Sequence, residues 1–266
     1  MTAAKPELLT IVRRMTSVLG AGFGATVGTQ MGDPVAGAMV GETLAQLGED
    51  FVDRVLSPRQ EERVATVLSS ATELISEGIA SGATLRDDGF FDDPHADASE
   101  VFEGILLAAR DEHEAKKLPY LAKLMSAIAF DKNLTVDAAN FLIIETDRLT
   151  WLQMCLLAIV SRPEEFPLPE TNVGEYGTNW GDWTVSRTFH RMMAPEGSFL
   201  QSPPLKDPAT GFPGFDLRLS HLQLTNQGQL TASALGLSAI PADDLRDTHA
   251  TLVRLAELRH EERGGD

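Results

Sequence analysis

The stretch MTSVLGAGFGATVGTQMGDPVAGAMV, residues 15–40, decides how the N-terminal part of this chain packs. Glycine recurs there at four-residue spacing, at Gly20, Gly24, Gly28 and Gly32, and a second pair with this spacing, Gly37 and Gly41, follows Asp33-Pro34. On an α-helix this spacing places glycines on one side, where the backbone of a second helix can approach closely. Asp33 is a good helix N-cap and Pro34 suits the first helical position. The stretch therefore predicts two helices folded into a hairpin.

These glycines carry an energetic cost that packing has to offset. An interior helical glycine costs about 1 kcal/mol relative to alanine, so the eight glycines from Gly20 to Gly48 cost about 8 kcal/mol together. A typical domain is stable by only about 5 to 15 kcal/mol. We therefore expect the glycine-lined faces to pack closely within the chain, against another copy of it, or inside a bilayer.

Residues 15–32 form an uncharged run whose length is marginal for a membrane span. As a helix the run extends about 27 Å, against about 30 Å of hydrocarbon in a bilayer. It also contains the polar residues Thr16, Ser17, Thr26, Thr29 and Gln30. The sequence leaves open a soluble hairpin, a hairpin that enters a membrane on a trigger, and a constitutive span; its composition favours the soluble hairpin.

The composition of the 266 residues limits the partners and the compartment. A formal net charge of -17 argues against a general nucleic-acid binder and against attraction to anionic lipid, since both rely on lysine and arginine. The single cysteine, Cys155, rules out an internal disulfide and fits a reducing compartment. The N-terminus has no compact apolar run that ends in a cleavage site. We expect a cytoplasmic protein, which becomes membrane-associated on activation if the hairpin inserts.

Helix signals along the rest of the chain predict a mainly α protein. It would have an N-terminal glycine-zipper hairpin, a helical core and a C-terminal winged-helix-like region with a small β element. The predicted segments are 1–82 for the hairpin plus a third helix, 83–97 for an acidic loop, 98–162 for the helical core, 163–240 for the winged-helix-like region with a proline-rich insertion, and 241–266 for a last helix and tail. Capping boxes from Ser57 to Gln60 and from Thr150 to Gln153 predict two helix starts. Alternation from Phe215 to Leu224 predicts a strand.

No pattern typical of an enzyme, a metal site or a cofactor site is present. Residues 20–25 match the dinucleotide pattern G-x-G-x-x-A, but no buried strand precedes them. The acidic loop at 83–97 lacks the spacing of a calcium loop, and the six histidines never pair at metal-ligand spacing. The motifs G-x-S-x-G, G-x-x-x-x-G-K and H-E-x-x-H do not occur. We predict no enzyme, and no catalytic, cofactor-binding or metal-binding residues.

Residues 149–235 have the order of elements of a winged helix. A helix LTWLQMCLLAIV is followed by a helix DWTVSRTFHRMM, a strand-like segment and the helix LTNQGQLTASAL. Arg187, His190 and Arg191 lie on one side of the second helix and are candidate contacts for a partner. The acidic net charge and the proline-rich insertion argue against a DNA reader and favour a protein-contact module.

Two segments resemble the Abi-alpha family, helical bacterial proteins associated with abortive infection. They are KKLPYLAKLMSAIAFDKNLTVDAANFLIIETDRLTWLQMCLLAIV and HLQLTNQGQLTASALGL. The matching positions are Pro119, Tyr120 and Leu121 at a helix start, and Leu224, Thr225 and Gly228 in a Leu-Thr-x-x-Gly segment. The likeness covers roughly residues 112–237 and carries no catalytic residues. It implies a role in anti-phage defence or growth arrest.

Two functions follow as expectations. The first is a non-enzymatic defence effector that acts through self-association or conditional membrane insertion of its glycine-zipper hairpin, and that forms a homo-oligomer. The alternative is a soluble adaptor or regulator that binds a protein partner through its winged-helix-like region. Nucleic acid is not an expected partner in either case.

Overall fold

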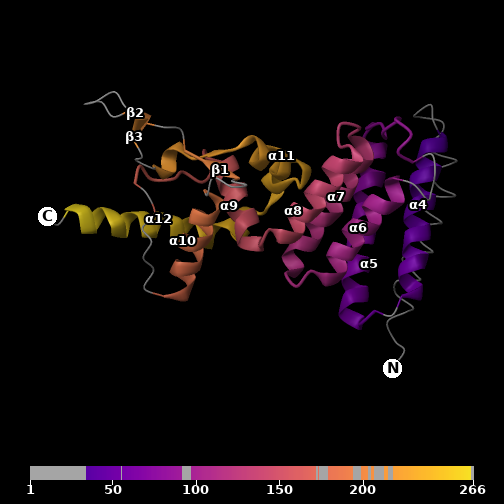
Figure 1. Cartoon of the computed structure of the whole chain (residues 1–266), viewed down its shortest axis with the longest axis horizontal. Helices are drawn as coiled ribbons and strands as arrows, with labels where there is room; N and C mark the ends of the chain where they lie inside the picture. Colours follow the sequence, from indigo (N-terminus) through magenta and orange to yellow (C-terminus); the bar gives the residue numbers. More distant parts are fainter. Residues whose placement is uncertain are drawn as a thin grey trace. The chain divides into compact units, whose positions relative to one another are not determined.

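The computed structural model describes residues 34–54, 56–91, 97–171, 173, 179–193, 199–202, 205–206, 213–214 and 218–264. The chain forms two compact units, Met1–Arg148 and Leu149–Asp266. Both are built mainly from helices (Figure 1), which confirms the predicted mainly α class. The boundary falls inside the segment 98–162, because the helix that begins at Trp151 packs with the helices that follow it.

The first unit is a group of antiparallel and crossing helices. Its elements are α4 (Pro34–Asp53), α5 (Pro58–Ala80), α6 (Asp97–Asp111), the 3-10 helix η2 (Ala115–Lys117), α7 (Leu118–Phe130) and α8 (Val136–Arg148). Helix α5 packs against α6 and α7, while α6 also contacts α4 and α8 (Figure 1). The core is apolar, with Leu68, Ile75 and Phe102 fully buried between these helices.

The capping box before α5 is confirmed. The backbone N–H of Ser57 donates to the side-chain oxygen of Gln60 at 3.0 Å, and the N–H of Gln60 donates back to the Ser57 hydroxyl at 3.4 Å. The same reciprocal bonds join Thr150 and Gln153 at the start of α9. Each box satisfies two of the backbone donors that a helix N-terminus leaves without intrahelical partners.

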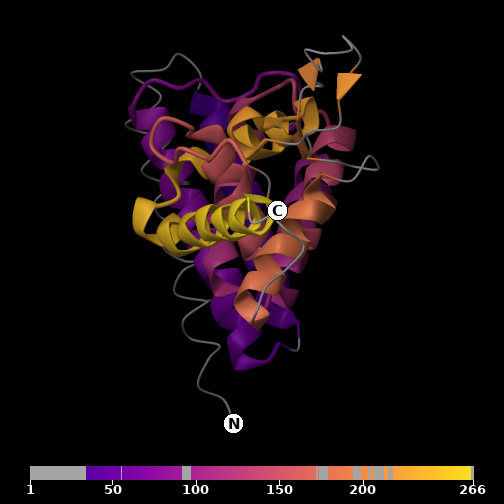
Figure 2. The same cartoon turned by 90° about the vertical axis from the view of Figure 1, so that its left-hand side faces the viewer.

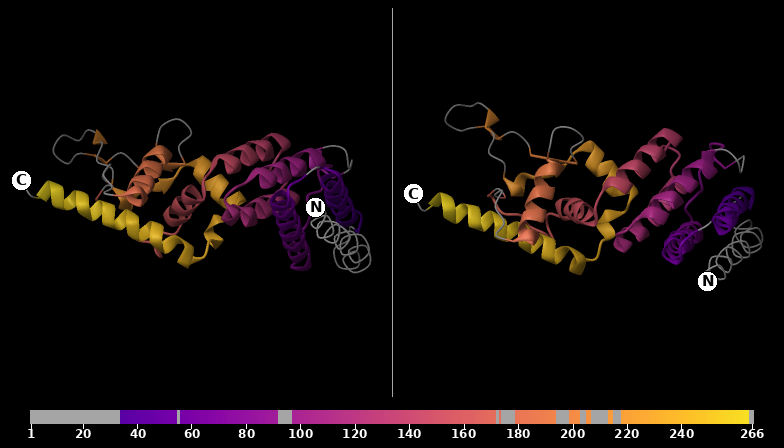
Figure 3. Two further views of the ribbon diagram at one scale, coloured as in Figure 1. Left: turned by 90° about the horizontal axis from the view of Figure 1, so that it is seen from below. Right: turned by 60° about the horizontal axis from the view of Figure 1, so that its bottom comes forward.

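The second unit combines helices with two short antiparallel ladders. Its elements are α9 (Trp151–Ser161), α10 (Trp180–Met192), β1 (Leu200–Gln201), β2 (Leu205–Lys206), β3 (Pro213–Gly214), η3 (Leu219–His221), β4 (Gln223–Leu224), α11 (Asn226–Ala234), η4 (Leu237–Ala239) and α12 (Ala242–Gly264). Leu200 pairs with Leu224, and Leu205 pairs with Gly214. Helix α12 contacts α9 and α10; Figure 2 shows it beside α10, and Figure 3 shows its length.

The predicted strand from Phe215 to Leu224 is largely wrong in the part that the structure describes. Only Gln223–Leu224 is a strand, and Leu219–His221 forms a 3-10 turn. The backbone N–H groups of Leu219 and Ser220 donate to carbonyls of Thr171 and Pro169, in the chain that follows α9. These bonds to a loop replace the ladder that the alternating pattern predicted, while Leu219 still enters the core.

The predicted glycine hairpin lies only partly within the described residues. Gly20, Gly24, Gly28 and Gly32 lie outside the described residues, whereas Gly37 and Gly41 belong to α4. Gly41 is buried, next to the core residues Val40 and Leu44. None of the helices in the described part of the chain is both long and apolar enough to cross a membrane.

Candidate functional site

Helix α10 carries the clearest candidate site in the described residues. Its start is fixed by Asn179, whose side-chain oxygen accepts a hydrogen bond from the N–H of Asp182 at 3.0 Å. One side of the helix is buried through Val185, Phe189 and Met192. The opposite side is therefore presented outward in a fixed orientation.

An ion pair holds α10 against α12. Asp182 is buried, and Arg254 of α12 donates two hydrogen bonds to its carboxylate, one of them at 2.7 Å from Nη1 to Oδ2. These bonds from Arg254 keep the pKa of Asp182 below its ordinary value, with a further contribution from Asn179, although burial acts in the opposite direction. A charged Asp182 is thus part of the folded state of the second unit.

This pair predicts a loss of stability in acid. Because the pKa of Asp182 is lower in the folded than in the unfolded chain, its contribution is complete above the ordinary aspartate pKa of about 3.9 and disappears as the pH falls below that value. We expect Arg254→Met to lower the urea midpoint of the second unit at pH 7 and to lower it less at pH 3. Tryptophan fluorescence measures this directly, since all three tryptophans lie in the second unit.

The control is Arg246→Met, which removes an ion pair of Arg246 with Asp243 on the same helix. Both of those side chains are mostly exposed, at 71% and 81%. Their pair should contribute little at either pH, because solvent screens exposed charges. An equal effect of the Arg254 substitution at both pH values would contradict a structural role for the charged Asp182.

The outward side of α10 exposes two tryptophans. Trp180 is 81% exposed and Trp183 is 48% exposed. Their rings meet edge to face, with centroids 5.7 Å apart. Arg187 and Arg191 follow on the same helix and are also exposed. The spacing of three or four residues between these positions places all of them on one face, which we call the α10 face.

A pocket of about 200 Å³ opens on the α10 face. It is lined by Trp183, Ser186, Arg187 and His190. The Nδ1 atom of His190 lies 2.7 Å from the carbonyl oxygen of Ser186. Since a carbonyl only accepts, Nδ1 carries the proton, and the imidazole is held in one orientation at the wall of the pocket.

The structure brings together two of the three residues that the sequence singled out on this helix. Arg187 and His190 line the pocket, while Arg191 is exposed on the same helix and is not a lining residue. Sequence reasoning missed Trp180 and Trp183, which are the most exposed large apolar residues of the helix. Their spacing relative to Arg187 was the available signal, because positions three, four and seven apart share one helical face.

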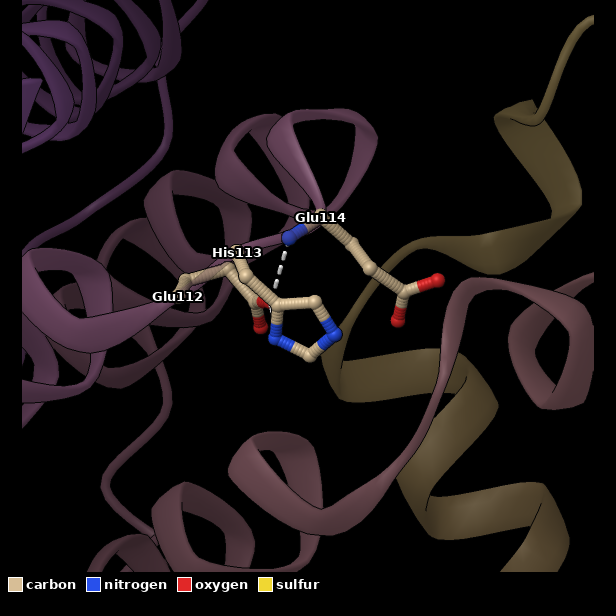
Figure 4. Close-up of side chains that lie close together, drawn as sticks. All are labelled: Glu112, His113 and Glu114. Atoms are coloured by element: carbon tan, nitrogen blue, oxygen red, sulfur yellow. Dashed lines mark hydrogen bonds and ion pairs between the residues drawn. The ribbon is translucent and has the colours of Figure 1, made fainter.

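A second cluster, in the first unit, looks like a metal site but is explained by other contacts. Ligand atoms of Glu112, His113 and Glu114 lie within 4.8 Å of one another (Figure 4). However, one carboxylate oxygen of the buried Glu112 pairs with Lys117, and the other accepts the N–H of Glu114 at 2.7 Å. The Glu112 carboxylate is thus already neutralised by an ammonium group, and His113 is 87% exposed.

Comparison of the chain with protein-family models, with curated proteins and with solved structures gives no match. The resemblance to the Abi-alpha family therefore stays a prediction. Its motif positions have structural roles here: Pro119 lies in the first turn of α7, Tyr120 is buried, and Thr225 caps α11 by accepting the N–H of Gly228 at 3.0 Å.

Proposed function

We propose that this protein is a non-enzymatic adaptor that binds a protein partner through the α10 face. The observation that carries the proposal is the pair of exposed tryptophans beside a pocket. Tryptophan and arginine are the residues most enriched among those that dominate binding energy at protein interfaces. Both residue types occur together on the α10 face, as Trp180, Trp183 and Arg187.

The tryptophans are not needed to fold the helix on which they stand. Val185, Phe189 and Met192 already fill the buried side of α10, and the pair between Asp182 and Arg254 fixes its position against α12. A tryptophan that is 81% exposed leaves most of its apolar surface in water, which is unfavourable by about 25 cal/mol for each Å². A partner that covers the α10 face would remove this cost.

The size of the pocket favours a protein partner over a small-molecule substrate. Ligand pockets in proteins commonly measure about 300 to 1,000 Å³. The pocket beside Trp183 measures about 200 Å³, which is room for one side chain of a partner.

Site-specific cross-linking tests this proposal. We expect the photo-reactive residue benzoylphenylalanine in place of Trp180 to form discrete adducts with one protein in the cell of origin. The same residue in place of Leu230 should not form them. Leu230 is a matched control because it is 70% exposed and lies on α11 of the same unit. Equal adducts at both positions, or none at residue 180, would speak against a binding role for the α10 face.

Self-association of the glycine hairpin in anti-phage defence is a second candidate function. It is favoured by Gly41 and Gly48, both buried in α4, because close helix packing at glycines is what the hairpin requires. The cross-linking experiment separates the two proposals. Replacing Gly24 and Gly28 by leucine should leave the adduct at residue 180 unchanged if the protein is an adaptor. If the protein acts by self-association, the same replacement should abolish its assembly and its effect on the cell.

A further inference from the structure

We infer that the segment bound at the α10 face is acidic, and that an aspartate or glutamate carboxylate of the partner enters the pocket and pairs with Arg187. This inference rests on the proposed adaptor function and adds the chemistry of the partner. It follows from three features of the described residues: the charges of the α10 face, the groups that line the pocket, and the spacing of the arginines.

The α10 face is cationic in a chain that is strongly acidic overall. Several arginines elsewhere in the described residues have carboxylate partners: Arg54 pairs with Glu103, Arg86 with Asp88, and Arg162 with Glu165. Arg187 and Arg191 are exposed and form no ion pair with any acidic residue in the part of the chain that the structure describes. The chain has 39 acidic residues against 22 lysines and arginines, so two adjacent arginines without a carboxylate partner leave that position open to an external one.

The pocket has the groups that a carboxylate requires. A guanidinium binds a carboxylate through two parallel N–H donors, and Arg187 supplies such a group at the wall. Trp183 forms an apolar wall beside it, which suits the methylene groups of an aspartate or glutamate side chain. The volume of about 200 Å³ is room for one such side chain.

The spacing of the cations favours a polypeptide over a nucleic acid. Arg187 and Arg191 are four residues apart, which is about 6 Å along a helix. The affinity of a protein for nucleic acid depends on how many phosphates its lysines and arginines neutralise. Two arginines on one turn, in a chain of net charge -17, satisfy one or two carboxylates of a peptide but not a run of phosphates.

The test uses the full chain and three labelled probes in a fluorescence anisotropy titration. The first probe is an octapeptide in which every residue is glutamate except one phenylalanine near the middle. The second is the same peptide with glutamine for every glutamate, and the third is a twelve-nucleotide oligothymidine. We expect the glutamate peptide to bind at least tenfold more tightly than the glutamine peptide. Arg187→Glu and Arg187→Gln should each lower the affinity for the glutamate peptide tenfold or more. Arg59→Glu, at an exposed arginine that starts α5 in the other unit, should change its affinity less than twofold.

Three results would overturn the inference. They are equal binding of the two peptides, no effect of the Arg187 substitutions, and tighter binding of the oligothymidine than of the glutamate peptide. An unchanged urea midpoint of the Arg187 variants, followed by tryptophan fluorescence, verifies that the second unit is folded. If the adduct at residue 180 forms while the peptide test fails, the α10 face is a binding surface, and only the inference that the bound segment is acidic is wrong.

Discussion

Replacing Lys117 by methionine should destabilise the first unit by about 3 to 5 kcal/mol, the usual cost of removing one member of a buried ion pair. Lys117 and Glu112 are both only 2% exposed, and the ammonium group also donates to the carbonyl of Asp147 at 3.3 Å, at the end of α8. The substitution leaves the Glu112 carboxylate buried without its counter-charge. Urea unfolding followed by far-ultraviolet circular dichroism measures the loss.

Two further variants test whether the loss of stability comes from the buried charge of Glu112. The double variant Lys117→Met with Glu112→Gln should recover much of the stability, because it removes the uncompensated charge and keeps an oxygen to accept the N–H of Glu114. The control Lys132→Met makes the same change in an exposed pair with Asp87, and should cost about 1 kcal/mol or less. If Lys117→Met and the double variant are equally stable, the uncompensated charge of Glu112 is not the cause of the destabilisation.

Gly228→Ala should destabilise the second unit by about 3 kcal/mol, near the upper end of the usual cost of overpacking. A Cβ atom at this position would lie 2.2 Å from the carbonyl oxygen of Phe199. That oxygen belongs to the backbone and accepts the N–H of Thr225 at 3.0 Å, so it cannot rotate away as a side chain could. The contact joins the start of α11 to the chain just before β1.

The shift of the urea midpoint by tryptophan fluorescence measures the effect of Gly228→Ala. The control is Gly104→Ala in α6, where the added Cβ would lie 3.4 Å from a terminal methyl carbon of Ile143, an ordinary contact. That change should raise the stability of the first unit by up to about 1 kcal/mol, since alanine is the better helix former. A fully stable Gly228→Ala protein would mean that β1 and α11 do not approach as closely as described.

The parts of the fold that could be predicted from the sequence are those determined locally. Ser57 with Gln60, and Thr150 with Gln153, predicted two helix starts because a capping box closes within four residues. The strand prediction failed because Leu219 bonds to a loop nearly fifty residues earlier, and no local pattern contains that loop.

The candidate site and the effects predicted for Gly228 and Lys117 also divide into features that a local pattern reveals and features that depend on distant residues. Arg187 and His190 could be found by their charge and spacing, but the pocket depends on which side of α10 the rest of the unit buries. Gly228 was recognised as part of a motif, whereas the reason for a glycine is a carbonyl at Phe199. The stabilising role of Lys117 could not be predicted, because it depends on the burial of the Glu112 carboxylate, which the sequence does not reveal.

The dissociation constant of the partner that cross-links at residue 180 shows whether the α10 face binds that partner. It should be measured by calorimetry with the purified full chain and with its Trp183→Ala and Leu230→Ala variants. We expect Trp183→Ala to weaken binding about thirtyfold or more, which is the effect of losing an interface residue worth about 2 kcal/mol or more, and Leu230→Ala to leave binding unchanged. An unaltered affinity of the Trp183→Ala variant would mean that the α10 face does not bind the partner.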